Sequence, residues 1–233
     1  MLYFRHYVDK RGYVVKLFAK LTSFLLVLAI VFGVAVLPAT AKVETVPKVD
    51  TVDEDEIVAR MYVGYNERYL GMSGHSWIYV ENLTDHSIVV GAYTVKKGKA
   101  VSLGTAGTTL EDGRGLYYNV EAYRYRDIPI TDYVHLSKDI TQKQLDKLTK
   151  RVLNAGTWSY FLNCTYFAAS AWNSVGGLPL VYALFPPLFH VQILINPNHG
   201  NGFRMQVPAL TEIYKQVGRG DKATLVQTDP TYV

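Results

Sequence analysis

Cysteine is almost absent from this chain, because Cys164 is the only one in 233 residues. A single cysteine cannot form an internal disulfide, so the fold has no covalent cross-link. A lone cysteine in an exported chain indicates either pairing between molecules or a free reactive thiol. The alternative is a small buried apolar residue that only fills space.

An excess of one charge is also lacking once the N-terminal segment is set aside. The whole chain has 24 basic and 20 acidic residues, but residues 1–41 hold five of the basic ones and only one acid. The remainder therefore carries 19 of each sign. This balance gives no electrostatic reason to expect a nucleic acid or an anionic membrane as partner.

Only one long apolar run is present, the 17 residues from 21 to 37. Basic residues precede it, and Pro38-Ala-Thr-Ala41 follows it with small residues at the positions that a signal peptidase requires. We predict a signal peptide over residues 1–41, with an uncleaved membrane anchor as the alternative. Either arrangement puts the rest of the protein outside the cytoplasm, secreted or in the cell envelope, with membrane contact only through residues 21–37 if the segment is uncleaved.

Histidines in metal-binding spacing are missing as well. His135, His190 and His199 are too irregularly spaced to form a recognisable ligand set. We predict no metal and no cofactor.

The rest of the chain divides into an acidic linker, residues 42–56, and one domain, residues 57–233. Residues 57–63, 75–81, 87–95, 116–124 and 133–136 are strand-like, and residues 82–85 look like a hairpin loop between the second and third of these runs. If so, Glu81 pairs with His86, and Ala92 lies opposite His75. Successive strands without intervening helices predict an antiparallel sheet.

Helical periodicity begins after residue 140. Thr141 and Gln144 form a capping box before an apolar helical face that Gly156 ends, and Asn163 is a favoured N-cap residue for a second helix. Residues 178–207 look irregular, and residues 208–217 are a candidate last helix. Strands first and helices second predict an α+β fold in which the antiparallel sheet packs against the helix that carries the cysteine.

This placement makes Cys164 a candidate nucleophile. A thiol at a helix N-terminus faces unpaired N–H groups and the positive end of the helix dipole, which stabilise the thiolate. The same N–H groups, including that of Cys164, can bind an oxyanion. His75, at the start of a predicted strand, is a candidate base for the pair.

Three motifs carry a resemblance to a known family: Gly74-His75 opening a strand, Gly115-Leu-Tyr-Tyr-Asn-Val-Glu121, and Asn163-Cys164-x-x-Phe-Ala168 at a helix start. Together they resemble the circularly permuted papain-like cysteine hydrolases of the NlpC type, which include the lecithin retinol acyltransferase group. The chain is also similar to uncharacterised exported Firmicutes proteins with these motifs. The resemblance covers roughly residues 70–175 and implies Cys164 as nucleophile and His75 as base.

It also implies a polar residue, on the strand after the histidine, that orients the histidine. The sequence leaves five candidates open: Tyr93, Thr94, His86, Asn119 and Glu121. The predicted hairpin puts His86 at the tip of its loop, away from the base.

Two aromatic residues before the cysteine, Trp158 and Tyr160, are candidates for lining a substrate pocket. We expect a thiol-dependent amidase, peptidase or acyltransferase that acts on a peptide, cell-wall or acyl substrate, with peptidoglycan peptides favoured in a bacterial envelope. The alternative is a non-catalytic envelope binding module on the same scaffold.

Overall fold

The computed structural model describes residues 54–66, 74–107, 113–129, 132–156, 158–181 and 186–230. Residues 50–233 cluster as one compact unit. The predicted signal peptide or anchor, residues 1–41, and nearly all of the linker lie outside the described residues. Among the residues that are described, no helix is both long enough and apolar enough to cross a bilayer.

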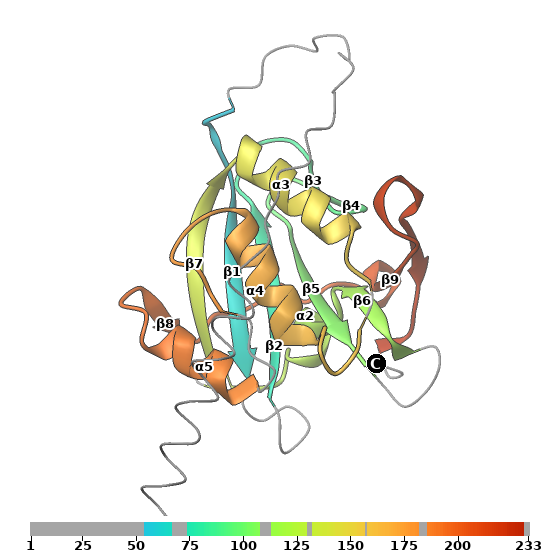
Figure 1. Ribbon diagram of the computed structural model, residues 1–233. Coiled ribbons are helices and arrows are strands. Elements are labelled where there is room, and N and C mark those ends of the chain that lie inside the picture. The colour runs from blue at the N-terminus through green and yellow to red at the C-terminus, as the bar shows by residue number, and fades with distance from the viewer. Residues whose placement is uncertain are drawn as a thin grey trace, which may run out of the picture. The chain divides into compact units, whose positions relative to one another are not determined.

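An antiparallel sheet of eight strands forms the centre of this unit, in the order β10-β9-β6-β5-β2-β1-β7-β8 (Figure 1). The long strands β1 and β2 lie in the middle because their apolar residues are buried. The strands are β1 (Ile57–Asn66), β2 (His75–Asn82), β5 (Ala100–Ala106), β6 (Gly115–Tyr118), β7 (Tyr133–Thr141), β8 (His199–Asn201), β9 (Tyr214–Val217) and β10 (Thr224–Gln227).

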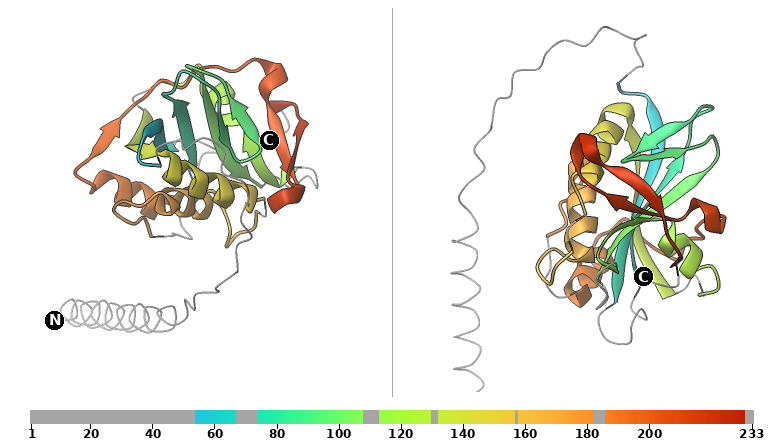
Figure 2. Two further views of the ribbon diagram at one scale, coloured as in Figure 1. Left: turned by 90° about the horizontal axis from the view of Figure 1, so that it is seen from above. Right: turned by 90° about the vertical axis from the view of Figure 1, so that its right-hand side faces the viewer.

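Helices cover both faces of the sheet unequally (Figure 2). Three helices, α3 (Gln142–Leu153), α4 (Cys164–Ser174) and α5 (Pro186–Leu194), lie on one side, and the short α2 (Val120–Arg124) lies on the other. The main core lies between the sheet and the three helices, and a second cluster that includes Trp77 and Tyr79 packs with Ala122 of α2. Strand β2 is therefore buried on both faces. The fold is α+β, with the strands first and the helices packed on the sheet, as predicted.

The predicted starts of the two helices are correct. Thr141 Oγ1 accepts from the N–H of Gln144 at 3.4 Å, and Gln144 Oε1 accepts from the N–H of Thr141 at 3.0 Å, so the capping box is complete. This reciprocal pair satisfies two backbone donors where β7 turns directly into α3. The N-cap of α4 is Asn163.

The predicted hairpin after β2 is wrong. Glu81 pairs with Arg60 of β1 and with Ala100 of β5, and His75 pairs with Asn66 of β1. The run at 87–95 is two short strands, β3 (Ile88–Val90) and β4 (Tyr93–Val95), which pair with each other in a separate sheet. Gly91 between them has φ +62°, which allows the tight turn that breaks the run.

Two further predictions of secondary structure are wrong. In both cases, contacts with distant segments decide the structure instead of the local sequence pattern. The expected strand at 116–124 ends at Tyr118, and Asn119 in the left-handed region (φ 69°) starts α2. The expected helix at 208–217 is a single 3₁₀ turn, η3 (Leu210–Glu212), followed by β9, because Lys215 and Tyr214 pair with β6. The region 178–207 is less irregular than expected, since it includes α5 and β8.

Candidate functional site

Cys164 is the first residue of α4, and its position is fixed by Asn163. The Asn163 side-chain oxygen accepts from the N–H groups of Thr165 and Tyr166 at 3.1 and 3.2 Å and from the Thr165 hydroxyl at 2.7 Å. The cysteine is buried, with 7% of its surface exposed. The sequence therefore places a thiol at a well-capped helix N-terminus beneath the surface.

His75 opens β2 and forms a side-chain hydrogen bond with Cys164. It is as buried as the cysteine. The next residue, Ser76, directs its backbone N–H to the sulfur, while its buried hydroxyl has no hydrogen-bond partner among the described residues. The two residues that open β2 thus contact the thiol from the sheet, while Cys164 itself comes from the helix layer.

Glu121, on α2, contacts the same histidine from the other face of the sheet. Its Oε1 lies 3.2 Å from His75 Nε2, and both side chains are buried. Cys164, His75 and Glu121 therefore form a connected chain of thiol, imidazole and carboxylate, drawn from α4, β2 and α2. Of the five candidates for the orienting position, Glu121 is the one that lies against His75.

Two residues of β5 hold the carboxylate in place. The Ser102 hydroxyl donates to Glu121 Oε2 at 3.2 Å and accepts from the N–H of Ala122 at 3.1 Å. Gly104 leaves the space that the carboxylate occupies: a Cβ at that position would overlap Glu121 Oε1 and lie 3.1 Å from His75 Nε2. The contact between Glu121 and His75 thus requires the absence of a side chain at residue 104.

The electrostatics of the site favour an ion pair between thiolate and imidazolium. Burial alone would lower the pKa of His75, but the charge and hydrogen bond of Cys164, followed by those of Glu121, outweigh burial and raise it to about 9. Burial likewise opposes the thiolate, yet the charge and hydrogen bond of His75 and the backbone N–H of Ser76 lower the pKa of Cys164 below its usual value. A thiol with a lowered pKa beside a protonated imidazole is the reactive form of a cysteine nucleophile.

The donors for an oxyanion are fewer than the helix start alone suggests. The Asn163 side chain already occupies the N–H groups of Thr165 and Tyr166, and the Asn163 carbonyl accepts from the N–H of Phe167. Among the described residues, these contacts do not involve the N–H of Cys164, so it is the donor of this turn that we assign to an oxyanion. We expected several N–H groups of the helix to bind the oxyanion, but the capping contacts leave one candidate, the N–H of Cys164.

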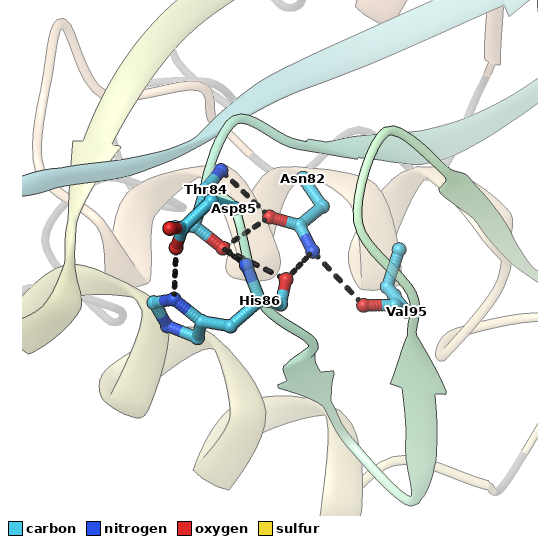
Figure 3. Close-up of polar contacts among 5 residues, drawn as sticks. All are labelled: Asn82, Thr84, Asp85, His86 and Val95. Atoms are coloured by element: carbon cyan, nitrogen blue, oxygen red, sulfur yellow. Dashed lines mark hydrogen bonds and ion pairs between the residues drawn. The ribbon is translucent and has the colours of Figure 1, made fainter.

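His86 lies far out on the loop after β2 (Figure 3). Its ring Nδ1 is 3.0 Å from Asp85, and 62% of the side chain is exposed. The Asn82 side chain binds Thr84 and the carbonyls of His86 and Val95, which directs the chain out of the main sheet. His86 therefore lies away from His75, although the hairpin from which we predicted this place does not form.

Tyr93 and Thr94 are equally removed from the imidazole. Both belong to β4, outside the eight-stranded sheet, and line a separate pocket with Glu212. The expected pairing of 87–95 with β2 would have put them near His75, and the turn at Gly91 prevents it.

Asn119 has a supporting role. Its side chain accepts from the N–H of Ser102 at 3.3 Å and donates to the carbonyl of Glu212 at 2.8 Å. These bonds fix the left-handed turn that starts α2, two residues before Glu121. Asn119 thus positions the helix that carries the carboxylate.

Trp158 and Tyr160 lie in the loop that leads to α4, with ring centroids 5.6 Å apart. Trp158 packs so closely over Gly107 that a Cβ there would overlap the indole ring. Tyr160 is 82% exposed. The indole thus anchors the loop before Cys164, and the tyrosine is accessible to a ligand.

Three contributors to the site have no clear signal in the sequence: Ser76, Ser102 and Gly104. Ser76 is adjacent to the candidate histidine, which is the only hint. Among the described residues, no group of three or more His, Cys, Asp and Glu side chains is arranged to hold a metal ion.

Comparison with known proteins gives no match: no family model, no curated protein and no solved structure is similar enough to this chain to be identified as related. The resemblance to permuted papain-like hydrolases therefore rests on the three motifs, and function must be inferred from the site.

Proposed function

We propose that this protein is an extracytoplasmic thiol-dependent hydrolase or acyltransferase that uses Cys164 as nucleophile. The observation that carries the proposal is the buried chain of Cys164, His75 and Glu121, in which each group contacts the next. A nucleophile, a base and a group that orients the base are the three parts of a catalytic triad, which is recognised by geometry rather than by order in the sequence.

The reaction follows from the orientation of the imidazole. His75 Nε2 faces Glu121, so Nδ1 is the nitrogen left for the thiol. Nδ1 holds the proton of Cys164, and the thiolate attacks the carbonyl carbon of an amide or ester. The N–H of Cys164 donates to the oxyanion, and the imidazolium then protonates the leaving amine or alcohol. Water or another acceptor attacks the thioester, and the thiol is released.

The order of the elements supports the family that the motifs resemble. In the permuted papain-like hydrolases the histidine comes from an early strand and the cysteine from a later helix, as His75 and Cys164 do here. For an exported bacterial protein with this chemistry, the substrate that fits best is a peptide amide of peptidoglycan. An acyl group carried by a lipid or a protein is the substrate of the acyltransferase form of the proposal.

The experiment is turnover of peptidoglycan fragments, followed by liquid chromatography and mass spectrometry. Cys164→Ala and His75→Ala should each lower turnover by roughly a thousandfold or more, because triad members act as a unit. Circular dichroism spectra that match the unaltered protein would show that both variants fold. Retained turnover in Cys164→Ala would overturn the mechanism.

The alternative is a binding module that keeps the scaffold without the chemistry. It predicts a thiol whose pKa stays near the ordinary value of about 8.5 and no turnover of any fragment. Alkylation of Cys164 by iodoacetamide across a pH series separates the two proposals. Glu121 weighs against the binding module, since a scaffold alone has no need of a buried carboxylate on the histidine.

A further inference from the structure

A cavity of about 170 Å³ lies beside the first turn of α4. Its walls include Leu162, Tyr166 and Phe167, which lie within three residues of Cys164 on either side. Phe167 is buried and Leu162 is partly exposed, so the cavity runs from the surface towards the core. It is therefore next to the helix that presents the thiol.

Positive charge dominates the lining. Arg151 of α3 and the exposed Arg219 both line the cavity, and none of the described aspartates or glutamates does. Arg151 is held by a hydrogen bond from its Nε to Ser170 at 2.9 Å and lies 5.5 Å from the centroid of the Tyr166 ring. Burial lowers the pKa of Arg151, and no carboxylate offsets that effect. A partly buried guanidinium held in this way is well suited to bind an anion.

A buried polar group at the cavity wall also lacks a partner. Thr105 of β5 lines the cavity, and its hydroxyl makes no hydrogen bond among the residues described, although only 3% of the residue is exposed. Buried hydroxyls are nearly always hydrogen-bonded, so an unpaired one marks a place where a ligand atom can complete the network.

The position of Thr105 connects the cavity to the catalytic groups. It directly follows Gly104, which adjoins Glu121 and His75. Ile78 of β2 pairs with Leu103 of β5. If this register is extended by two residues, Ser76 corresponds to Thr105. Ser76 is the residue that donates to the Cys164 sulfur.

We infer that this cavity binds a carboxylate of the substrate, through Arg151, Arg219 and the Thr105 hydroxyl. The inference rests on the proposed function and narrows it: the protein acts on acidic peptides whose carboxylate lies close to the scissile amide. Peptidoglycan peptides carry such free carboxylates.

The test uses matched peptides that differ only in glutamate or glutamine at each position flanking the scissile amide. At one position, glutamate should give a kcat/KM about 10- to 100-fold higher than glutamine, the range expected for a charge-assisted hydrogen bond. The preference should appear mainly in KM. Arg151→Gln and Arg219→Gln should remove it, while Lys147→Gln, which removes a charge from an exposed position on the same helix, should not.

A binding measurement separates this inference from the proposed function. Calorimetry with Cys164→Ala and the two peptides should show tighter binding of the glutamate peptide, and addition of Arg151→Gln should remove the difference. Turnover with equal kcat/KM for both peptides at every position would overturn the inferred carboxylate binding but would remain consistent with the proposed hydrolase activity. Peptide binding that depends on Arg151, without any turnover by the unaltered protein, would support carboxylate binding in the cavity and would overturn the proposed hydrolase activity. Because Arg151 also contacts Ser170, Arg219→Gln provides a variant at an exposed position that should fold normally.

Discussion

Replacing Glu121 by glutamine tests whether the carboxylate tunes the thiol or merely fills space. The substitution keeps the size of the side chain and an oxygen for Ser102, but it removes the negative charge 3.2 Å from His75 Nε2. His75 should then hold its proton less tightly. Since the imidazolium is what stabilises the thiolate, the pKa of Cys164 should rise.

The size of the effect follows from the pKa of His75. The difference between the ordinary 6.5 and about 9 corresponds to roughly 3.5 kcal/mol at about 1.4 kcal/mol per pH unit. Cys164 contributes more of this than Glu121 does. We therefore assign roughly 1 kcal/mol to the carboxylate, which predicts about a fivefold lower equilibrium ratio of the thiolate–imidazolium pair to the neutral thiol–imidazole pair.

The assay is the rate of iodoacetamide alkylation of Cys164 from pH 5 to 10, followed by intact-protein mass spectrometry. With one cysteine in the chain, every alkylation event reports on this site. Glu121→Gln should shift the profile to higher pH, whereas Glu81→Gln, which removes the same charge at the other end of β2, should not. Superimposable profiles for Glu121→Gln and the unaltered protein would refute the role given to the carboxylate.

Three further changes test the supports of the site. Gly104→Ala should slow alkylation and lower Tm, because its Cβ would displace the Glu121 carboxylate; normal reactivity would show that residue 104 does not set the contact. Asn163→Ala should cost about 1–2 kcal/mol in a urea denaturation series and also alter alkylation, since Asn163 caps the helix that presents the thiol. Thr141→Ala, at the cap of α3, should cost about 1 kcal/mol and leave alkylation unchanged, and equal reactivity of both cap variants would contradict this assignment. Hydrolysis of an amide should decline as the pH rises through about 9, because His75 loses the proton that the leaving amine needs; a kcat/KM that still rises above pH 10 would exclude His75 as the acid.

The parts of the site with local signals could be predicted from the sequence. Asn163 is a strong N-cap residue, so the start of α4 and the place of Cys164 follow from the chain itself. The strand that begins at His75 is equally clear, because β2 is a run of β-prone residues.

The choice of Glu121 among five candidates could not be predicted in the same way. It depends on the turn at Asn119, where a single left-handed residue ends β6 and starts α2. Propensity favoured a continuous strand there, just as it favoured one through Gly91. Both breaks are set by packing against distant segments: Asn119 bonds to Glu212, and a Cβ on Gly91 would overlap Val152. Such contacts carry no signal in the local pattern.

His75 contacts groups that come from both faces of the sheet, and this arrangement supports the proposed catalytic role. Cys164 comes from the helix layer on one face and Glu121 from α2 on the other, so the imidazole must contact both. The paired register of β2 with β5 runs from Glu81 to Ile78 and stops before His75, so the ring lies where this pairing has ended. Gly104 lies at that place, and any larger residue would displace the carboxylate. A binding module needs the sheet and the helices but has no need of a glycine there. The proposed mechanism requires this combination of a strand pairing that ends before His75, a missing side chain at residue 104 and a carboxylate held by Ser102, because His75 must keep its proton near Cys164.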